Sequence, residues 1–178
     1  MERIYKNSNL ILSAMFASLT VVCAWVTFPT AVPFTLQTLA VFLTALFLDF
    51  KYSLLSIFIY IGIGAVGFPA FSGFQGGAGV LLGPTGGYIT GFVFIILAVG
   101  IAKKLFPDSF FAEIFSLITG LALCYLFGTI WFMLVSKTDF ISAIIICVLP
   151  YVVFDGMKIL LALILCKKLR KIINKFIG

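Results

Sequence analysis

The sequence is dominated by six long apolar stretches, and these limit the chain to very few possible folds. They cover residues 7–28, 34–48, 52–67, 85–102, 114–136 and 140–166. A backbone inside hydrocarbon must satisfy its own hydrogen bonds, and a helix that crosses a membrane needs about 20 residues. With 63% hydrophobic and 10% charged residues among 178, the chain has no soluble domain of useful size. We therefore predict one all-α integral membrane domain over residues 1–178, with six transmembrane helices. The second and third stretches are short, so we expect these helices to tilt or to enter the membrane only partly.

The basic residues predict how the helices are oriented, because Lys and Arg near the ends of spans stay in the cytoplasm. Six crossings place both termini and the loops near Lys51 and Lys103 on one side. That side holds ten of the 12 basic residues, namely Arg3, Lys6, Lys51, Lys103, Lys104, Lys167, Lys168, Arg170, Lys171 and Lys175. The opposite loops hold only Lys137. We predict that both termini are cytoplasmic, and that the basic tail, residues 167–178, fixes this orientation and contacts anionic lipids rather than nucleic acid.

A glycine-rich segment, residues 67–88, separates the third stretch from the fourth and is predicted to be extracellular. It reads GFPAFSGFQGGAGVLLGPTGGY and contains eight of the 16 glycines and no charge. Its spacing excludes a phosphate-binding loop, because Gly83-Pro84-Thr85 stands where that loop has Gly-Lys-Thr. Two interpretations remain, either a connector whose glycines tolerate irregular turns or a loop that covers a small, partly apolar ligand. The second interpretation would use three rings and two neutral hydrogen-bonding groups, Phe68, Phe71, Phe74, Gln75 and Thr85.

Asp155 and Lys158 are the only ionisable pair well inside a predicted span, and their spacing puts them on one face of a helix. Charged groups inside a membrane usually face a pocket or pathway. Such a pair can accept from the N–H groups of a ligand and donate to its oxygens, or it can only neutralise itself and fix the sixth helix. Pro150 is expected to bend the helix nearby. Gln37 is a lone amide in an apolar span, and serves either a helix-to-helix hydrogen bond or ligand contact.

The residues that most enzyme chemistry needs are missing. The chain has no histidine, which excludes most hydrolase triads, and a single buried acid cannot form an aspartic dyad. The four cysteines lie in or at the end of spans without metal-ligand spacing, at Cys23, Cys124, Cys147 and Cys166. We therefore predict no enzyme activity, no metal site, no disulfide and no cofactor.

Three motifs, in their order along the chain, resemble the BioY family. They are LQTLAVFL, GAVGFPAFSGFQGGAGVLLGPTGGYITGF, and a proline, an aspartate and a lysine spaced as Pro150, Asp155 and Lys158. The resemblance covers about residues 13–161, and the block from Gly83 to Tyr88 is its most specific part. BioY proteins are the biotin-binding substrate subunits of energy-coupling factor transporters, with six membrane helices and an outward-facing site. The resemblance thus implies a multi-pass protein in the cell membrane of a prokaryote.

The resemblance also implies how biotin would be held. Asp155 would accept from the ureido N–H groups and Lys158 would donate to the ureido carbonyl, or, in a reversed pose, Lys158 would bind the tail carboxylate. The remaining contacts would come from the second span and the glycine-rich segment, at Gln37, Gly73, Phe74, Gln75, Gly77, Thr85 and Tyr88.

The energy for uptake is expected to come from partners, because the chain has no nucleotide site. The resemblance names these partners as a transmembrane coupling subunit and two cytoplasmic ATPase subunits. Family members carry an A-x-x-x-A motif that packs on the coupling subunit, and Ala14 and Ser18 match it here with a serine at the second position. Two other functions remain open, a substrate subunit for a different small vitamin and a structural membrane subunit whose Asp155/Lys158 pair only stabilises the fold.

Overall fold

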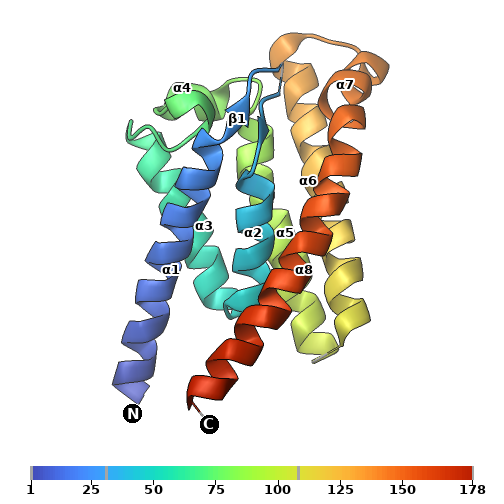
Figure 1. Cartoon of the computed structure of the whole chain (residues 1–178). Helices are drawn as coiled ribbons and strands as arrows, with labels where there is room; N and C mark the ends of the chain where they lie inside the picture. Colours follow the sequence, from blue (N-terminus) through green and yellow to red (C-terminus); the bar gives the residue numbers. More distant parts are fainter. Residues whose placement is uncertain (1, 31, 108, 178) are drawn as a thin grey trace.

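The structure, a computed structural model that describes residues 2–30, 32–107 and 109–177, is a bundle of helices along a common axis (Figure 1). Its helices are α1 (Glu2–Trp25), α2 (Gln37–Phe47), α3 (Phe50–Ala65), α4 (Ala78–Leu82), α5 (Gly86–Leu105), α6 (Phe110–Ser136), α7 (Phe140–Cys147) and α8 (Leu149–Ile177), with a 3-10 turn η1 (Ser72–Phe74). A short antiparallel hairpin, β1 (Thr27–Phe28) and β2 (Phe34–Thr35), joins α1 to α2. Both chain ends lie at one end of the bundle (Figure 1), which we call the inner end. The glycine-rich segment, the hairpin and α7 lie at the other, outer end.

Four helices are long and apolar enough to cross a membrane, and they support the prediction of an integral membrane protein. Within the described residues these are Asn7–Trp25, Gly86–Leu105, Phe110–Ser136 and Leu149–Leu169. The other two predicted spans correspond to α2 and α3, of 11 and 16 residues. At about 1.5 Å per residue, neither covers a hydrocarbon core of about 30 Å. The count of six crossings and the cytoplasmic position of the inner end stay predictions.

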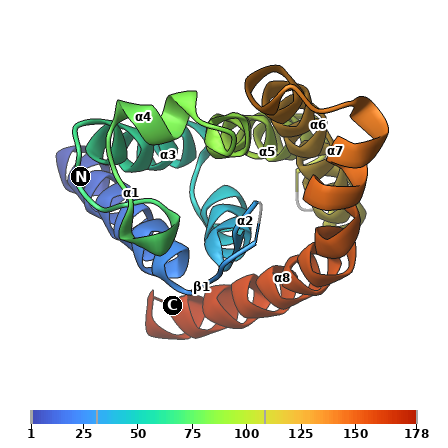
Figure 2. The same ribbon diagram turned by 90° about the horizontal axis from the view of Figure 1, so that it is seen from above.

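Helix α2 lies inside the ring that the longer helices form (Figure 2), which explains how so short a helix can exist in an apolar protein. Ala40, Val41 and Phe42 are fully buried there. At its C-terminus, Lys103 of α5 donates to the carbonyl oxygens of Ala45 and Leu46, both at 2.7 Å. Backbone groups at the end of a helix need such partners in the absence of water. The surrounding helices thus supply what the membrane-water interface supplies to a longer helix.

Small residues bring α5 and α6 into close contact. A Cβ atom at Gly87 would lie 2.3 Å from the Cβ of Trp131, and one at Gly128 would lie 2.3 Å from the ring of Tyr88. Neither position has room for a side chain, because an aromatic residue of the opposite helix packs directly against each glycine. The hydroxyl of Tyr88 also shares a hydrogen bond of 3.0 Å with Thr129 of α6.

The sixth predicted span is divided in two, which corrects the sequence-based boundary at residues 140–166. The helix breaks at Val148, where φ is −121° and ψ is −55°, between α7 and α8. Pro150 lies in the first turn of α8, where its missing N–H costs no hydrogen bond within the helix. Asp139 begins α7 by accepting from the backbone N–H of Ser142 at 3.0 Å, and this contact lowers the pKa of the Asp139 carboxyl.

The glycine-rich segment is ordered, because it folds into η1, α4 and the first turn of α5. Gly77 adopts a φ of 98° and donates to the carbonyl of Gly64 at 2.7 Å, a conformation that glycine adopts at little cost. Two tryptophans hold the segment at its ends. Trp25 donates to the carbonyl of Pro69 at 2.7 Å, and Trp131 donates to that of Gly83 at 2.9 Å. Gly67, Gly73 and Gly77 have positive φ, as the connector interpretation expects of glycines in turns, so both interpretations of the segment stay open.

Candidate functional site

A cavity lies among α2, α5, α6 and α8 and reaches the glycine-rich segment. We call it the deep cavity; its free volume is about 60 Å³, so in this structure it is narrower than most small-ligand sites. Its walls are Val32, Pro33, Thr35, Gln37, Thr38, Ser72, Thr85, Tyr88, Ile89, Phe92, Leu121, Cys124, Tyr125, Cys147, Tyr151, Asp155 and Lys158. Most of these groups are apolar or neutral, so the cavity suits a neutral, partly apolar ligand.

Asp155 and Lys158 form a buried ion pair in the wall of this cavity. The carboxylate Oδ1 lies 2.7 Å from the ammonium Nζ, and the two residues are 3% and 7% exposed. Their i, i+3 spacing on α8 brings the side chains together, as the sequence predicts. Each charge offsets the cost of burying the other, and the pair as a whole is neutral.

The ion pair is held by neighbours on two other helices. Lys158 also donates to the carbonyl of Thr35 at 2.7 Å and to Thr38 Oγ1 at 3.0 Å, so its three N–H groups all have partners. Its Nζ lies 4.4 Å from the ring centroid of Phe34. Asp155 accepts from Thr38 at 2.8 Å and from the hydroxyl of Tyr125. The pair is therefore fixed before any ligand arrives, with its donor and acceptor atoms at the cavity wall.

Gln37 performs the helix-to-helix role that the sequence left open, and it also lines the deep cavity. Its amide nitrogen donates to the hydroxyl of Tyr60 on α3, and its amide oxygen accepts from Thr35 Oγ1 at 2.9 Å. The side chain is thereby held in one orientation at the cavity wall. Both interpretations of Gln37 are compatible with this position.

A second, more open hollow lies at the outer end, above the deep cavity. We call it the outer hollow; it is lined by Thr30, Pro33, Ser72, Gln75, Gly76, Gly79, Val80, Gly83, Pro84 and Thr85. Pro33, Ser72 and Thr85 line both spaces. The deep cavity therefore opens outward past these three residues, along the glycine-rich segment.

The glycine-rich segment meets the cavity with fewer residues than predicted. Thr85 and Tyr88 line the deep cavity, and Gln75 lines the outer hollow. Gly73 and Gly77 line neither space, and their positive φ values serve the turns of the segment itself. The contacts of these two glycines with a ligand stay a prediction.

The phenylalanines of the segment line neither of the two spaces, and their contact with a ligand stays a prediction. Phe71 is fully buried against Tyr60, with ring centroids 5.7 Å apart, and fills the space beside Gly64. Phe74 is 61% exposed and stacks on Trp25 at 5.1 Å, away from both cavities. Phe68 is half exposed and lines neither of them. The rings instead attach the segment to α1 and α3, because the segment runs across these helices before it reaches α5.

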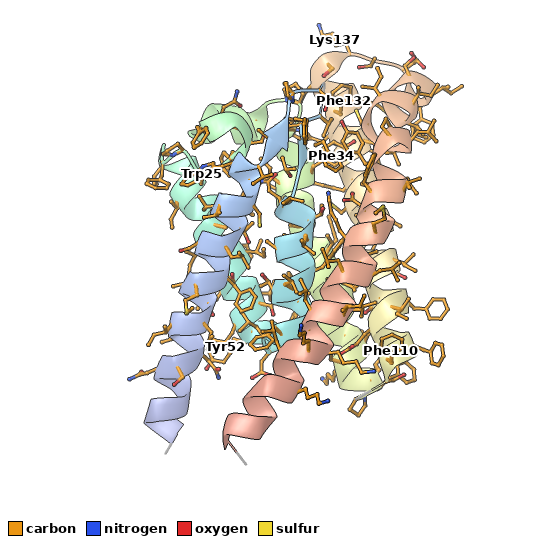
Figure 3. All side chains as sticks on the ribbon, in the orientation of Figure 1. Trp25, Phe34, Tyr52, Phe110, Phe132 and Lys137 are labelled. Atoms are coloured by element: carbon orange, nitrogen blue, oxygen red, sulfur yellow. The ribbon has the colours of Figure 1, made fainter. Side chains whose placement is uncertain are left out.

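Several cavity residues escaped the sequence analysis. Thr38 is adjacent to Gln37 in a motif that was singled out, and Tyr125 follows Cys124 on the small-residue face of α6, so both carried a weak signal. Tyr151 gave none, yet its hydroxyl donates to the carbonyl of Val32 and lies 2.9 Å from Thr30 Oγ1. This contact joins α8 to the hairpin over the cavity. Figure 3 labels Phe34, which belongs to strand β2 of this hairpin, just below the outer end.

Ala14 and Ser18 lie on an exposed face of α1, away from the cavity. Ser18 donates to the carbonyl of Ala14 at 2.9 Å, so its hydroxyl is satisfied within the helix. The face therefore presents small side chains and no unpaired hydroxyl. The predicted contact with a partner helix is not tested by this, but the position allows it.

Comparisons with known proteins agree on one family. Residues 1–175 match the model of the family described as the BioY family. The biotin transporter BioY of Thermotoga maritima is 39% identical over 92% of this chain and 96% of its own length. The probable biotin transporter BioY of Pyrococcus horikoshii is 37% identical over 93% of this chain and 98% of its own. A crystal structure of the S-component for biotin from an ECF-type ABC transporter has a TM-score of 0.87 at 26% identity, covering 96% of this chain and 95% of that one. The chain therefore belongs to the BioY family.

Proposed function

We propose that this protein is the biotin-binding membrane subunit of an uptake transporter, and that it holds biotin in the deep cavity. The observation that carries the proposal is the buried Asp155–Lys158 pair in the wall of a cavity that opens at the outer end. The proteins that this chain resembles are named for biotin. The site proposed here gives that function a chemical basis in this chain.

The ureido ring of biotin is the chemical counterpart of this ion pair. The ring is neutral, with two N–H donors and one carbonyl acceptor. Asp155 can accept from it, and Lys158 can donate to it when the ureido oxygen replaces one of its three present acceptors. The reversed pose would put the tail carboxylate beside Asp155, which lies 2.7 Å from Lys158. One ammonium would then face two carboxylates in a poorly solvated place, a strongly unfavourable arrangement. We therefore place the ureido ring at the pair and the tail toward the outer hollow.

Aromatic side chains provide the surroundings for the rest of the bicyclic ring. Phe92 and the rings of Tyr88, Tyr125 and Tyr151 line the same cavity. Burial of the thioether ring against them contributes about 25 cal/mol for each Å² of apolar surface removed from water. In this proposal Gln37 and Thr85 orient the ligand by hydrogen bonds.

Partners complete the proposed function. An S component of an ECF-type ABC transporter works with transmembrane and ATPase modules, and we propose a coupling subunit and two ATPase subunits for this chain. The exposed face of α1 supports a docking role, because Ala14 and Ser18 allow a close helix approach. In the proposed cycle the protein captures biotin outside and releases it inside after it reorients against the coupling subunit.

The test is biotin binding by isothermal titration calorimetry to the purified protein in lipid nanodiscs. We expect saturable binding that falls at least about tenfold in Asp155→Asn, because each hydrogen bond with a charged partner contributes about 1.5 to 3 kcal/mol. Asp49→Asn, which changes an exposed carboxylate at the inner end, should bind as the parent does. The folded state of each variant is checked by size-exclusion chromatography and thermal unfolding.

Each alternative function predicts a different result of the same titration. Stronger binding of another unlabelled vitamin would assign the site to that vitamin. Folded protein that binds none of them, with Asp155→Asn lowering only the stability, would support the structural subunit. Either outcome would overturn the proposal.

A further inference from the structure

The deep cavity and the outer hollow differ in charge. Lys158 is the only cation that lines either space among the residues that the structure describes. Its three N–H groups already have partners, one of them the carboxylate of Asp155. The described residues of the outer hollow offer only neutral groups. Its side-chain hydrogen-bond donors are Thr30, Ser72, Gln75 and Thr85.

The other basic side chains that the structure describes lie elsewhere. Lys51, Lys103 and Lys104 belong to the inner ends of α3 and α5 (Figure 1), and Lys103 is bonded to carbonyl oxygens of α2. Lys137 lies at the outer end, on the connection between α6 and α7 (Figure 3), and lines neither space. Among the side chains that the structure describes, a negative charge in the outer hollow therefore has no lysine or arginine beside it.

We infer that this site recognises the ureido head of biotin and not the charge of its tail, so that it also accepts biotin whose carboxyl group is an amide. This inference rests on the proposed function, because it takes the head to be at Asp155 and Lys158. The substrate class then includes biotinamide and biotin joined through an amide to the side chain of lysine. The added group would leave through the outer hollow, whose free volume is about 620 Å³ and which is open to the outside.

The neutral donors of the outer hollow explain why an amide should serve as well as a carboxylate. Hydroxyl and amide N–H groups donate to a carboxylate oxygen and to an amide carbonyl alike. The N-terminus of α5 at Gly86 is the one feature there that favours an anion, through the helix dipole. A helix dipole typically contributes about 0.3 to 1 kcal/mol to such a preference, which is a few-fold in affinity. Charge on the tail therefore has little influence on binding.

The experiment compares four ligands by competition calorimetry on the parent protein in nanodiscs. The ligands are biotin, biotinamide, Nε-biotinyl-lysine, and 2-iminobiotin, which keeps the tail and replaces the ureido oxygen by a cationic imine. We expect biotinamide and biotinyl-lysine to bind within about tenfold of biotin. We expect 2-iminobiotin to bind more than about a hundredfold more weakly, because its charged head faces Lys158.

The variant Lys158→Gln shows which part of the ligand Lys158 contacts. With the head at the pair, Lys158→Gln weakens biotin and biotinamide by the same factor, whereas Lys137→Gln changes neither. If biotin binds and the affinity for biotinamide is more than about a hundredfold lower, a cation contacts the tail carboxylate. The inference is then wrong, while the proposed function stands in the reversed pose. If biotin itself does not bind to folded protein, the proposed function and the inference both fail.

Discussion

Thr38→Val tests whether the ion pair must be prepositioned for binding, because the Thr38 hydroxyl contacts both charges. It donates to Asp155 Oδ1 at 2.8 Å and accepts from Lys158 Nζ at 3.0 Å. Valine has nearly the same shape and removes both hydrogen bonds. The pair itself stays intact, since Asp155 and Lys158 still contact each other at 2.7 Å.

The expected size of the effect follows from these contacts. A hydrogen bond with a charged group contributes about 1.5 to 3 kcal/mol in soluble proteins, but bonds between membrane helices average about 0.6 and reach about 1.7 kcal/mol. Asp155 keeps its bonds from Lys158 and Tyr125. We therefore expect Thr38→Val to lower stability by about 1 to 2 kcal/mol and biotin affinity by about tenfold, since 1.4 kcal/mol is a factor of ten.

Thr44→Val is the matched control on the same helix. Thr44 is fully buried, and its hydroxyl bonds within α2, to the carbonyl of Ala40 at 2.7 Å. This variant should lose some stability and keep its biotin affinity. Calorimetry gives the affinities, and thermal unfolding gives the stabilities. Equal affinities of the parent and Thr38→Val, or equal losses in the two valine variants, would refute the reasoning.

Three further changes test other contacts in the fold. Tyr151→Phe removes the hydroxyl that joins α8 to the hairpin over the cavity. Stability should fall by about 0.5 to 1.5 kcal/mol, and stopped-flow measurement should show biotin dissociating several-fold faster. An unchanged rate would mean that the hairpin does not retain the ligand. Gly87→Ala should lower stability by about 1 to 3 kcal/mol because of its overpacking against α6, whereas Gly62→Ala, on an open face of α3, should leave it equal or raise it by up to about 1 kcal/mol. Lys103→Gln should lower the thermal stability of the protein, because it removes the ammonium that donates to carbonyl oxygens at the end of α2. Lys104→Gln changes an exposed neighbour and should leave the stability unchanged. Equal effects of the two variants would argue against a stabilising contact between Lys103 and α2.

Local sequence rules predicted the features of this protein that depend on near neighbours in the chain. The spacing of Asp155 and Lys158 puts them on one helix face, and the structure joins them at 2.7 Å. Gly87 of α5 and Gly128 of α6 each belong to a row of small residues four positions apart, a spacing typical of close helix contacts, and the structure packs both against the opposite helix. The length of the apolar stretches predicted the long apolar helices α1, α5 and α6. In each case the signal lies within one helix.

The sequence did not predict contacts between distant parts of the chain. Thr38 meets Asp155 across 117 positions, and no local pattern relates the two. Phe74 was assigned to the ligand because it belongs to a glycine-rich segment, but the path of that segment brings it to Trp25. The break at Val148 was missed because a proline can bend a helix or begin a new one. The sequence near Pro150 does not distinguish a bent helix from two separate helices, and the structure shows two, α7 and α8.

The two tryptophans that hold the glycine-rich segment also make it optically visible. They are the only two in the chain, and each indole donates to a carbonyl near one end of the segment, at Pro69 and at Gly83. Opening of either end would break one of these bonds and expose that indole to a more polar medium, which shifts its emission. A protein that keeps Trp25 and one that keeps Trp131 would thus report separately on the two ends. The order in which the entrance opens can therefore be followed in real time without any attached dye.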